Sequence, residues 1–137
     1  MEIKFDLEKI IKEYPAERIA KEIKASPDFV KNEIHKIGAY AGWLDLQVER
    51  FLIENFKTKS KGAVSGNDDG KNFYEVDNTS MTIHYSNPEM RYAIETENSH
   101  VYNSILKLKE NVEGGHAPEI NDPSVIKKKL YCGCNKT

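Results

Sequence analysis

The sequence predicts an α+β protein: an N-terminal helix-turn-helix unit of three helices, extended by a long helix, and then a small antiparallel β-meander and a C-terminal helix. Two patterns lead to this prediction. Up to residue 58, apolar residues recur every three or four positions, which is the spacing of amphipathic helices. After residue 70, short aromatic and β-branched runs alternate with turn-forming residues, which is typical of strands.

Length and composition limit the class of protein. The chain has 137 residues, which is enough for one hydrophobic core. Hydrophobic residues make up 39% and charged residues 31%, a balance typical of soluble globular proteins. The change of pattern divides the chain into a helix-turn-helix helical domain, residues 1–60, and a small α+β accessory region, residues 61–137.

The same sequence argues against membrane and secreted classes. It has no run of about 18 apolar residues, so no membrane-spanning segment and no membrane partner are expected. Acidic residues are mixed into MEIKFDLEKI, so a signal peptide is not expected and the protein is predicted to be cytoplasmic. Cys132 and Cys134 are too few for a disulfide scaffold, and without well-spaced partners they predict no metal site.

The first two helices are predicted to be short. Residues 6–14 place apolar side chains on one side of a helix that Asp6 caps and Pro15 ends. Residues 16–23 repeat the helical spacing, with a small residue, Ala20, among larger ones.

A third helix begins at Ser26-Pro27-Asp28, which combines a hydroxyl cap, a proline at the first helical position and an acid near the positive end of the helix dipole. Val30 and Ile34 are its predicted buried pair, and Gly38 is its predicted C-cap. Residues 41–58 then form the long helix, and residues 57–70 are polar enough to predict a linker or mobile loop.

The second half changes period. NFYEV, MTIHY and MRYAIET predict three antiparallel strands, because DNTS and SNPE between them favour turns. Residues 99–112 return to the helical period. Their apolar stripe consists of Val101, Ile105, Leu108 and Val112. Both this stripe and the aromatic stripe of residues 43–56 are predicted either to form the seam of a dimer or to belong to the core.

Residues 16–38 carry the functional hypothesis. A helix-turn-helix needs a small residue where the two helices cross, a tight turn, and an outward face on the second helix that enters the major groove. Ala20 provides the small residue and Lys24-Ala25-Ser26 the turn.

IAKEIKASPDFVKNEIHKI resembles the helix-turn-helix of LuxR-type transcription regulators, in which I-A-x-x-L-G-x-S-x-x-T-V-K-x-H-L recurs. The resemblance is limited to residues 16–38, and Lys24 stands where that family has its turn glycine. It implies that Lys31 and its neighbours contact DNA. The residues on matching positions are Ile19, Ala20, Ser26, Val30, Lys31 and Ile34.

The first hypothesis is therefore a DNA-binding transcriptional regulator that acts as a homodimer, because one recognition helix makes too few base contacts for useful specificity. Arg18, Lys21 and Lys24 are predicted to hold the phosphate backbone of double-stranded DNA. Ser26 faces the groove in this scheme, and Lys31, Asn32 and His35 would read base edges. Alternatively, these residues are helix-surface groups whose charges pair with neighbouring glutamates.

The second hypothesis is a non-enzymatic inhibitor or adaptor, for example of viral origin, that uses the same scaffold to bind a protein or a small anionic ligand. The net charge of only −2 and the aromatic second half favour it. No nucleophile–base pair and no phosphate-binding glycine loop stands out, so neither an enzyme, a catalytic residue nor a cofactor is predicted.

Overall fold

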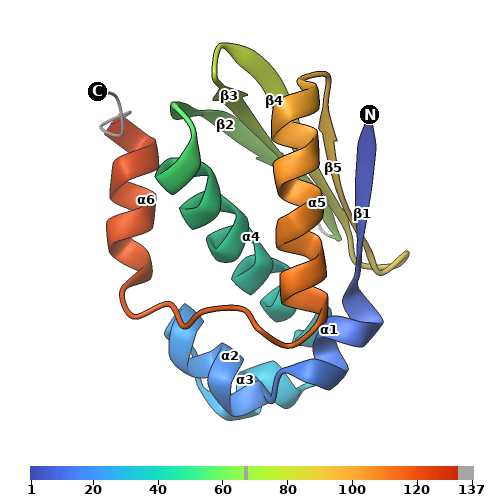
Figure 1. The fold of residues 1–137 in the computed structure, drawn as a ribbon. Helices are drawn as coiled ribbons and strands as arrows, with labels where there is room; N and C mark the ends of the chain where they lie inside the picture. The colour runs from blue at the N-terminus through green and yellow to red at the C-terminus, as the bar shows by residue number, and fades with distance from the viewer. Residues whose placement is uncertain (67, 133–137) are drawn as a thin grey trace.

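The structure is a computed structural model that describes residues 1–66 and 68–132. It confirms the α+β class: one antiparallel sheet is covered on one face by helices (Figure 1). Along the chain the elements are β1 (Glu2–Asp6), α1 (Leu7–Glu13), α2 (Ala16–Ile23), α3 (Pro27–Lys31), α4 (Lys36–Asn55), β2 (Thr58–Ser65), β3 (Asp69–Val76), β4 (Thr79–Ser86), β5 (Arg91–Thr96), α5 (Ser99–Glu113) and α6 (Pro123–Cys132).

The sheet has five strands in the order β1-β5-β4-β3-β2, with every neighbouring pair antiparallel. The three predicted strands are confirmed as β3, β4 and β5. The predicted turn DNTS is a two-residue hairpin in which Asp77 and Asn78 have φ values of 49° and 66°. Positive φ at both positions matches the right-handed twist of the paired strands.

Two strands were not predicted, and their positions correct the sequence analysis. β1 precedes the first helix and pairs with β5; its alternation of Ile3 and Phe5, both buried, with charged residues is too short to stand out. β2 replaces most of the linker predicted for residues 57–70. It is a largely exposed edge strand with lysines and a bulge between Ser60 and Gly62, features that discourage further strand pairing.

The N-terminal helices mostly follow the prediction, with a correction after Lys31. Asp6 caps α1 as expected, its side chain accepting a hydrogen bond from the Lys9 backbone N–H. The third helix ends at Lys31 instead of continuing toward Gly38, because Asn32 turns to an extended backbone and its side chain accepts a hydrogen bond from the Ile34 N–H. Gly38 is therefore not a C-cap: it lies within α4.

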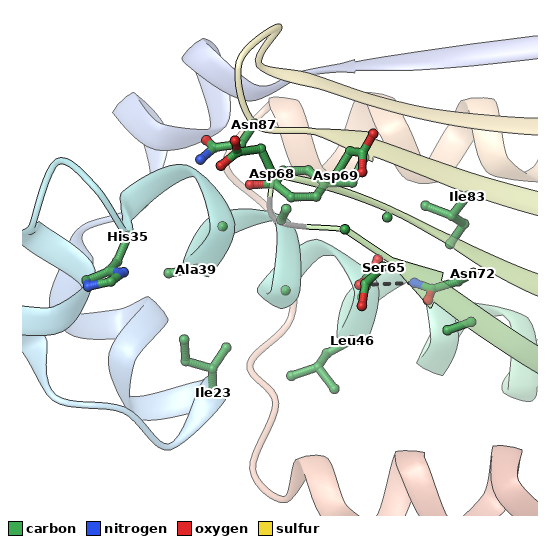
Figure 2. Close-up of a pocket in the computed structure, with 18 of the residues that line it drawn as sticks. Ile23, His35, Ala39, Leu46, Ser65, Asp68, Asp69, Asn72, Ile83 and Asn87 are labelled. Atoms are coloured by element: carbon green, nitrogen blue, oxygen red, sulfur yellow. Dashed lines mark hydrogen bonds between the residues drawn. The ribbon is translucent and has the colours of Figure 1, made fainter.

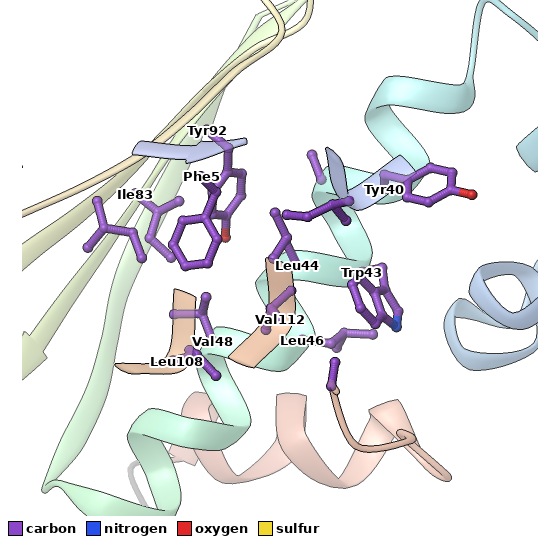
Figure 3. Close-up of a cluster of buried hydrophobic side chains, with 14 of the residues drawn as sticks. Phe5, Tyr40, Trp43, Leu44, Leu46, Val48, Ile83, Tyr92, Leu108 and Val112 are labelled. Carbon is purple, nitrogen blue, oxygen red and sulfur yellow. The ribbon is translucent and has the colours of Figure 1, made fainter. Parts of the chain in front are cut away.

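The core lies between α4, α5 and the sheet. Figure 3 shows Leu44 and Val48 of α4 among side chains from the strands and from α5. The α5 stripe is buried there, and Trp43 of α4 is buried against Tyr14 and Glu22, on the side of α1 and α2, so these residues contribute to the core of the chain. One hydrophobic cluster includes side chains from both predicted regions, 1–60 and 61–137, and the division between these regions stays a prediction.

Among the described residues, no helix has the length and apolar character needed to cross a membrane. Cys134 lies outside the described residues.

Candidate functional site: an open groove beside the helix-turn-helix

The first predicted phosphate contact, Arg18, points into the protein. Its Nε donates to Glu22 Oε2 at 2.7 Å and its Nη2 donates to the Ala117 carbonyl at 2.6 Å. The guanidinium also lies over the rings of Tyr14 and Trp43, 5.0 and 5.7 Å from their centroids. These contacts fasten α2 to the connection between α5 and α6, so the geometry gives Arg18 a structural role.

Glu22 is the centre of this cluster. Only 1% of it is exposed. Besides Arg18, its Oε1 accepts hydrogen bonds from Trp43 Nε1 at 2.7 Å and from the Ile120 backbone N–H at 3.1 Å. A buried carboxylate is tolerated when a cation and further donors satisfy it, and here all of its donors come from the chain itself.

The other two predicted phosphate contacts lie at the surface. Lys21 is mostly exposed, and its Nζ lies 3.9 Å from Glu119 Oε1. Lys24 is the C-cap of α2 and adopts the left-handed conformation, with φ 63° and ψ 46°. This is the backbone shape that the turn glycine of the resembled family would supply without strain.

The residues predicted to face the major groove are exposed, and their polar atoms are partly used within the segment. Ser26 Oγ caps α3 by accepting from the Phe29 N–H. Lys31 Nζ lies 2.6 Å from Glu17 Oε2, an ion pair that raises the pKa of Lys31 and lowers that of Glu17. The Asn32 side chain is held against the Ile34 backbone N–H.

The remaining residue of the predicted set, His35, stacks on Phe29, with ring centroids 4.4 Å apart and planes inclined by 10°. Ile34 beside it is 76% exposed, so the predicted buried pair is only half right: Val30 is buried and Ile34 is not. The reason is the end of α3 at Asn32, which breaks the helical register between the two positions. The α3–α4 turn therefore presents apolar surface to solvent.

This turn borders an open groove of about 710 Å3. We call it the α4–hairpin groove. Figure 2 shows its two walls: Ile23, His35 and Ala39 come from the helices, whereas Ser65, Asp68 and Asp69 come from the β2–β3 hairpin. β4 adds Ile83 and Tyr85, and the N-terminal end of α6 adds Pro123 and Lys127, so the groove is formed by parts of the chain that are far apart in sequence.

Small residues on α4 leave this space open. Gly38, Ala41 and Gly42 recur at the spacing of one helix face, and all three line the groove. A Cβ atom added at Gly42 would have no atom within 4 Å, and one added at Gly38 would meet only the Tyr85 hydroxyl at 3.5 Å. The groove thus follows from missing side chains on α4.

Asp45 lies one turn further along this face and places a carboxyl group in the groove. It is partly exposed and accepts two hydrogen bonds from neutral donors: the Tyr92 hydroxyl reaches Oδ1 at 2.5 Å and Asn72 Nδ2 reaches Oδ2 at 3.3 Å (dashed line at Asn72 in Figure 2). Desolvation raises the pKa of Asp45 to about 7, and the charge of Glu49 adds to the rise.

Glu49 lies one turn beyond Asp45 and is buried. Its Oε2 accepts a hydrogen bond of 2.6 Å from the Tyr74 hydroxyl, and its Oε1 lies 3.1 Å from the Lys127 ammonium. Burial and the nearby carboxylates raise the pKa of Tyr74 and of Tyr92, so both hydroxyls stay protonated donors. Lys127 is thus paired with Glu49, and its charge also acts on Asp45, where it opposes the rise in pKa; within the described residues no ion pair joins a cation to Asp45.

The groove was not predicted from the sequence. Asp45 was available as a signal, because it falls between Leu44 and Leu46 on a helix predicted to be buried, where an acidic residue needs a reason. Its partners could not be foreseen, since Asn72 and Tyr92 lie on strands that approach only in the folded chain.

Among residues 1–66 and 68–132, no cluster of three or more His, Cys, Asp or Glu side chains has an arrangement suited to a metal ion. Comparisons with protein-family models, curated proteins and solved structures gave no match to this chain.

Proposed function

We propose that this chain is a non-enzymatic protein-binding module, an inhibitor or adaptor, which receives a segment of its partner in the α4–hairpin groove. The observation that carries the proposal is the placement of exposed apolar side chains. Within the described residues, five large hydrophobic side chains are exposed, and three of them line this one groove.

These three side chains come from both walls. Phe29 and Ile34, 43% and 76% exposed, belong to the helix-turn-helix side, and Val64, 65% exposed, belongs to the hairpin. Apolar residues scattered singly on a surface need no explanation, but a group around a concave site is typical of a binding surface. Since water is displaced from both walls at once, one inserted segment would bury all three.

DNA binding receives less support from the same contacts. Arg18 is engaged with Glu22, and Lys31 with Glu17, so two of the predicted cations would have to leave internal partners. α3 has only five residues, and the acids Asp28 and Glu33 are exposed beside its outer face. Affinity for a duplex depends largely on cations that are free to neutralise phosphates.

The proposal can be tested by selecting peptides from a random phage library against the intact protein. Peptides are then compared for binding to wild type, to Ile34→Asp and to Val125→Asp. Val125 is the matched control, because it is also an exposed apolar residue, 47% exposed, but lies on α6 outside the groove. We expect the selected peptides to lose at least about tenfold in affinity with Ile34→Asp, and little with Val125→Asp.

Two results would overturn the proposal. One is peptide binding that Ile34→Asp leaves intact. The other is a gel shift with random duplex DNA that weakens steeply with salt and disappears in Lys31→Glu, which would restore the DNA-binding regulator as the better hypothesis.

A further inference from the structure

We infer that the α4–hairpin groove contains a subsite for a guanidinium group, in which Asp45 receives an arginine side chain of the partner segment. The inference rests on the proposed function, because it names the group that the groove recognises beyond its apolar rim.

The first support is the hydrogen bonding of Asp45. Each of its oxygens accepts one hydrogen bond, from Tyr92 and from Asn72. A carboxylate oxygen has two lone pairs, so each oxygen keeps one acceptor position. The two donors are neutral, and they orient the carboxylate without neutralising its charge.

The second support is the balance of charge around the groove. Asp68 and Asp69 on the hairpin add two carboxylates to that of Asp45. Among the described residues the groove has one lysine, Lys127, which lies against Glu49 and offsets only part of this negative charge. The site is therefore complementary to a cation and opposed to the small anionic ligand considered from the sequence.

The third support is the shape and polarity of the walls, which favour guanidinium over ammonium. Leu46, Ile83 and the Tyr85 ring line the groove near polar groups, so an occupant loses part of its water. Guanidinium is more weakly hydrated than ammonium, and its planar fork can donate to both oxygens of one carboxylate. The open space above Gly42 allows a side chain to pass along α4 toward Asp45.

The test uses n-butylguanidinium as the probe and 1-pentanol as a neutral molecule of similar size. Binding to the full chain is followed at neutral to slightly alkaline pH by the backbone amide NMR signals of Gly42 and Asn72. We expect saturable shifts with n-butylguanidinium, much weaker shifts with 1-pentanol, and at least a tenfold loss of affinity in Asp45→Asn. Asp69→Asn is the comparison variant: it removes a hairpin carboxylate that adds to the charge of the groove but accepts no hydrogen bond from the guanidinium in this proposal, so it should lose clearly less affinity than Asp45→Asn.

A second variant keeps the inference testable if Asp45→Asn alters the fold. Gly42→Met leaves Asp45 in place but fills the space above α4, and it should also abolish the shifts. The inference is overturned if wild type shows no saturable shift, if both molecules bind alike, or if Asp69→Asn loses as much affinity as Asp45→Asn.

The outcome separates the two proposals. If selected peptides depend on Ile34 but n-butylguanidinium does not bind, the guanidinium subsite is wrong and the protein-binding function stands. If n-butylguanidinium binds through Asp45 but no selected peptide depends on Ile34, the guanidinium subsite is supported and the proposal that the groove receives a segment of a partner protein is wrong.

Discussion

Glu22 and Asp45 are both acidic residues on helices that line the groove, but their carboxylates have different hydrogen-bond donors. Glu22 on α2 is held by a guanidinium, an indole N–H and a backbone N–H, all from the protein. In the part of the chain that the structure describes, Asp45 on α4 accepts from a hydroxyl and an amide, and it borders open space. The comparison indicates that the donors around a carboxylate, more than its burial, distinguish a structural acid from one available to a ligand.

The difference begins with the surroundings of each residue. The connection between α5 and α6 runs beside α2 (Figure 1). It places the Ile120 N–H and the Ala117 carbonyl beside the Arg18–Glu22 pair. Near Asp45, Gly42 of α4 carries no side chain, and no atom lies within 4 Å of the place where its Cβ atom would be. A covering segment closes one site, and missing side chains leave the other open.

The largest expected effect follows from removing the cation of the closed site around Glu22. Arg18→Ala leaves Glu22 buried without its cation and frees the Ala117 carbonyl, so the free energy of unfolding should fall by about 3–5 kcal/mol. Lys21→Ala, on the same helix with an exposed side chain, is the control and should change it by less than about 1 kcal/mol. Urea unfolding of both variants measures the difference; equal effects would mean that Arg18 is merely a surface cation.

The second effect concerns the open site and depends on pH. The folded state holds the Asp45 proton up to about pH 7, whereas the unfolded chain releases it near the ordinary aspartate pKa of 3.8, so this group's contribution to stability falls as pH rises between these values. The variant Asp45→Asn has no titrating group at this position, so it does not lose this stability as pH rises. Its unfolding free energy relative to wild type should therefore rise, by roughly 3–4 kcal/mol, from pH 4 to pH 8.

Urea unfolding of wild type and Asp45→Asn at several pH values measures this trend. The contributions of the other titrating groups to the pH dependence are nearly the same in the two proteins, so they cancel in the difference between the two unfolding free energies. A difference that is constant with pH, or that falls as pH rises, would mean that Asp45 is ionised throughout and is not desolvated by its surroundings.

The smallest effect concerns the helix-turn-helix turn between the two sites. Lys24 has a left-handed backbone that glycine adopts without a steric penalty, so Lys24→Gly should raise the free energy of unfolding by about 1 kcal/mol. Lys21→Gly, in the middle of α2, should lower it by a similar amount. Thermal unfolding of the pair checks both signs, and a loss of stability in Lys24→Gly would contradict the left-handed assignment.

Local chemistry was sufficient to predict several elements. The Asp6 cap, the Ser26-Pro27 start of α3 and the strands β3 to β5 are fixed by residues close in sequence. The end of α3 could not be predicted in the same way, because the apolar pattern of Val30 and Ile34 continues while Asn32 interrupts the helix. The edge strands were missed because pairing with a neighbour, rather than their own composition, defines them.

The same distinction applies to the predicted DNA contacts. The residue types of positions 16–38 favour a surface segment rich in cations, and Lys21, Lys24 and Lys31 are indeed exposed. Arg18 has the same sequence signal, but its side chain turns inward because Glu22 and the Ala117 carbonyl lie beneath it. Contacts with a residue about a hundred positions away cannot be read from the spacing of a helix.

By itself, the sequence determined the α+β class and the order of most helices and strands, because periodicity, caps and turn residues act over a few positions. Tertiary structure alone decided which acid is closed and which is open, because the donors of Glu22 and Asp45 come from segments that meet only on folding. The groove has the same origin: glycines on α4 create a cavity only where a hairpin and α6 stand opposite them.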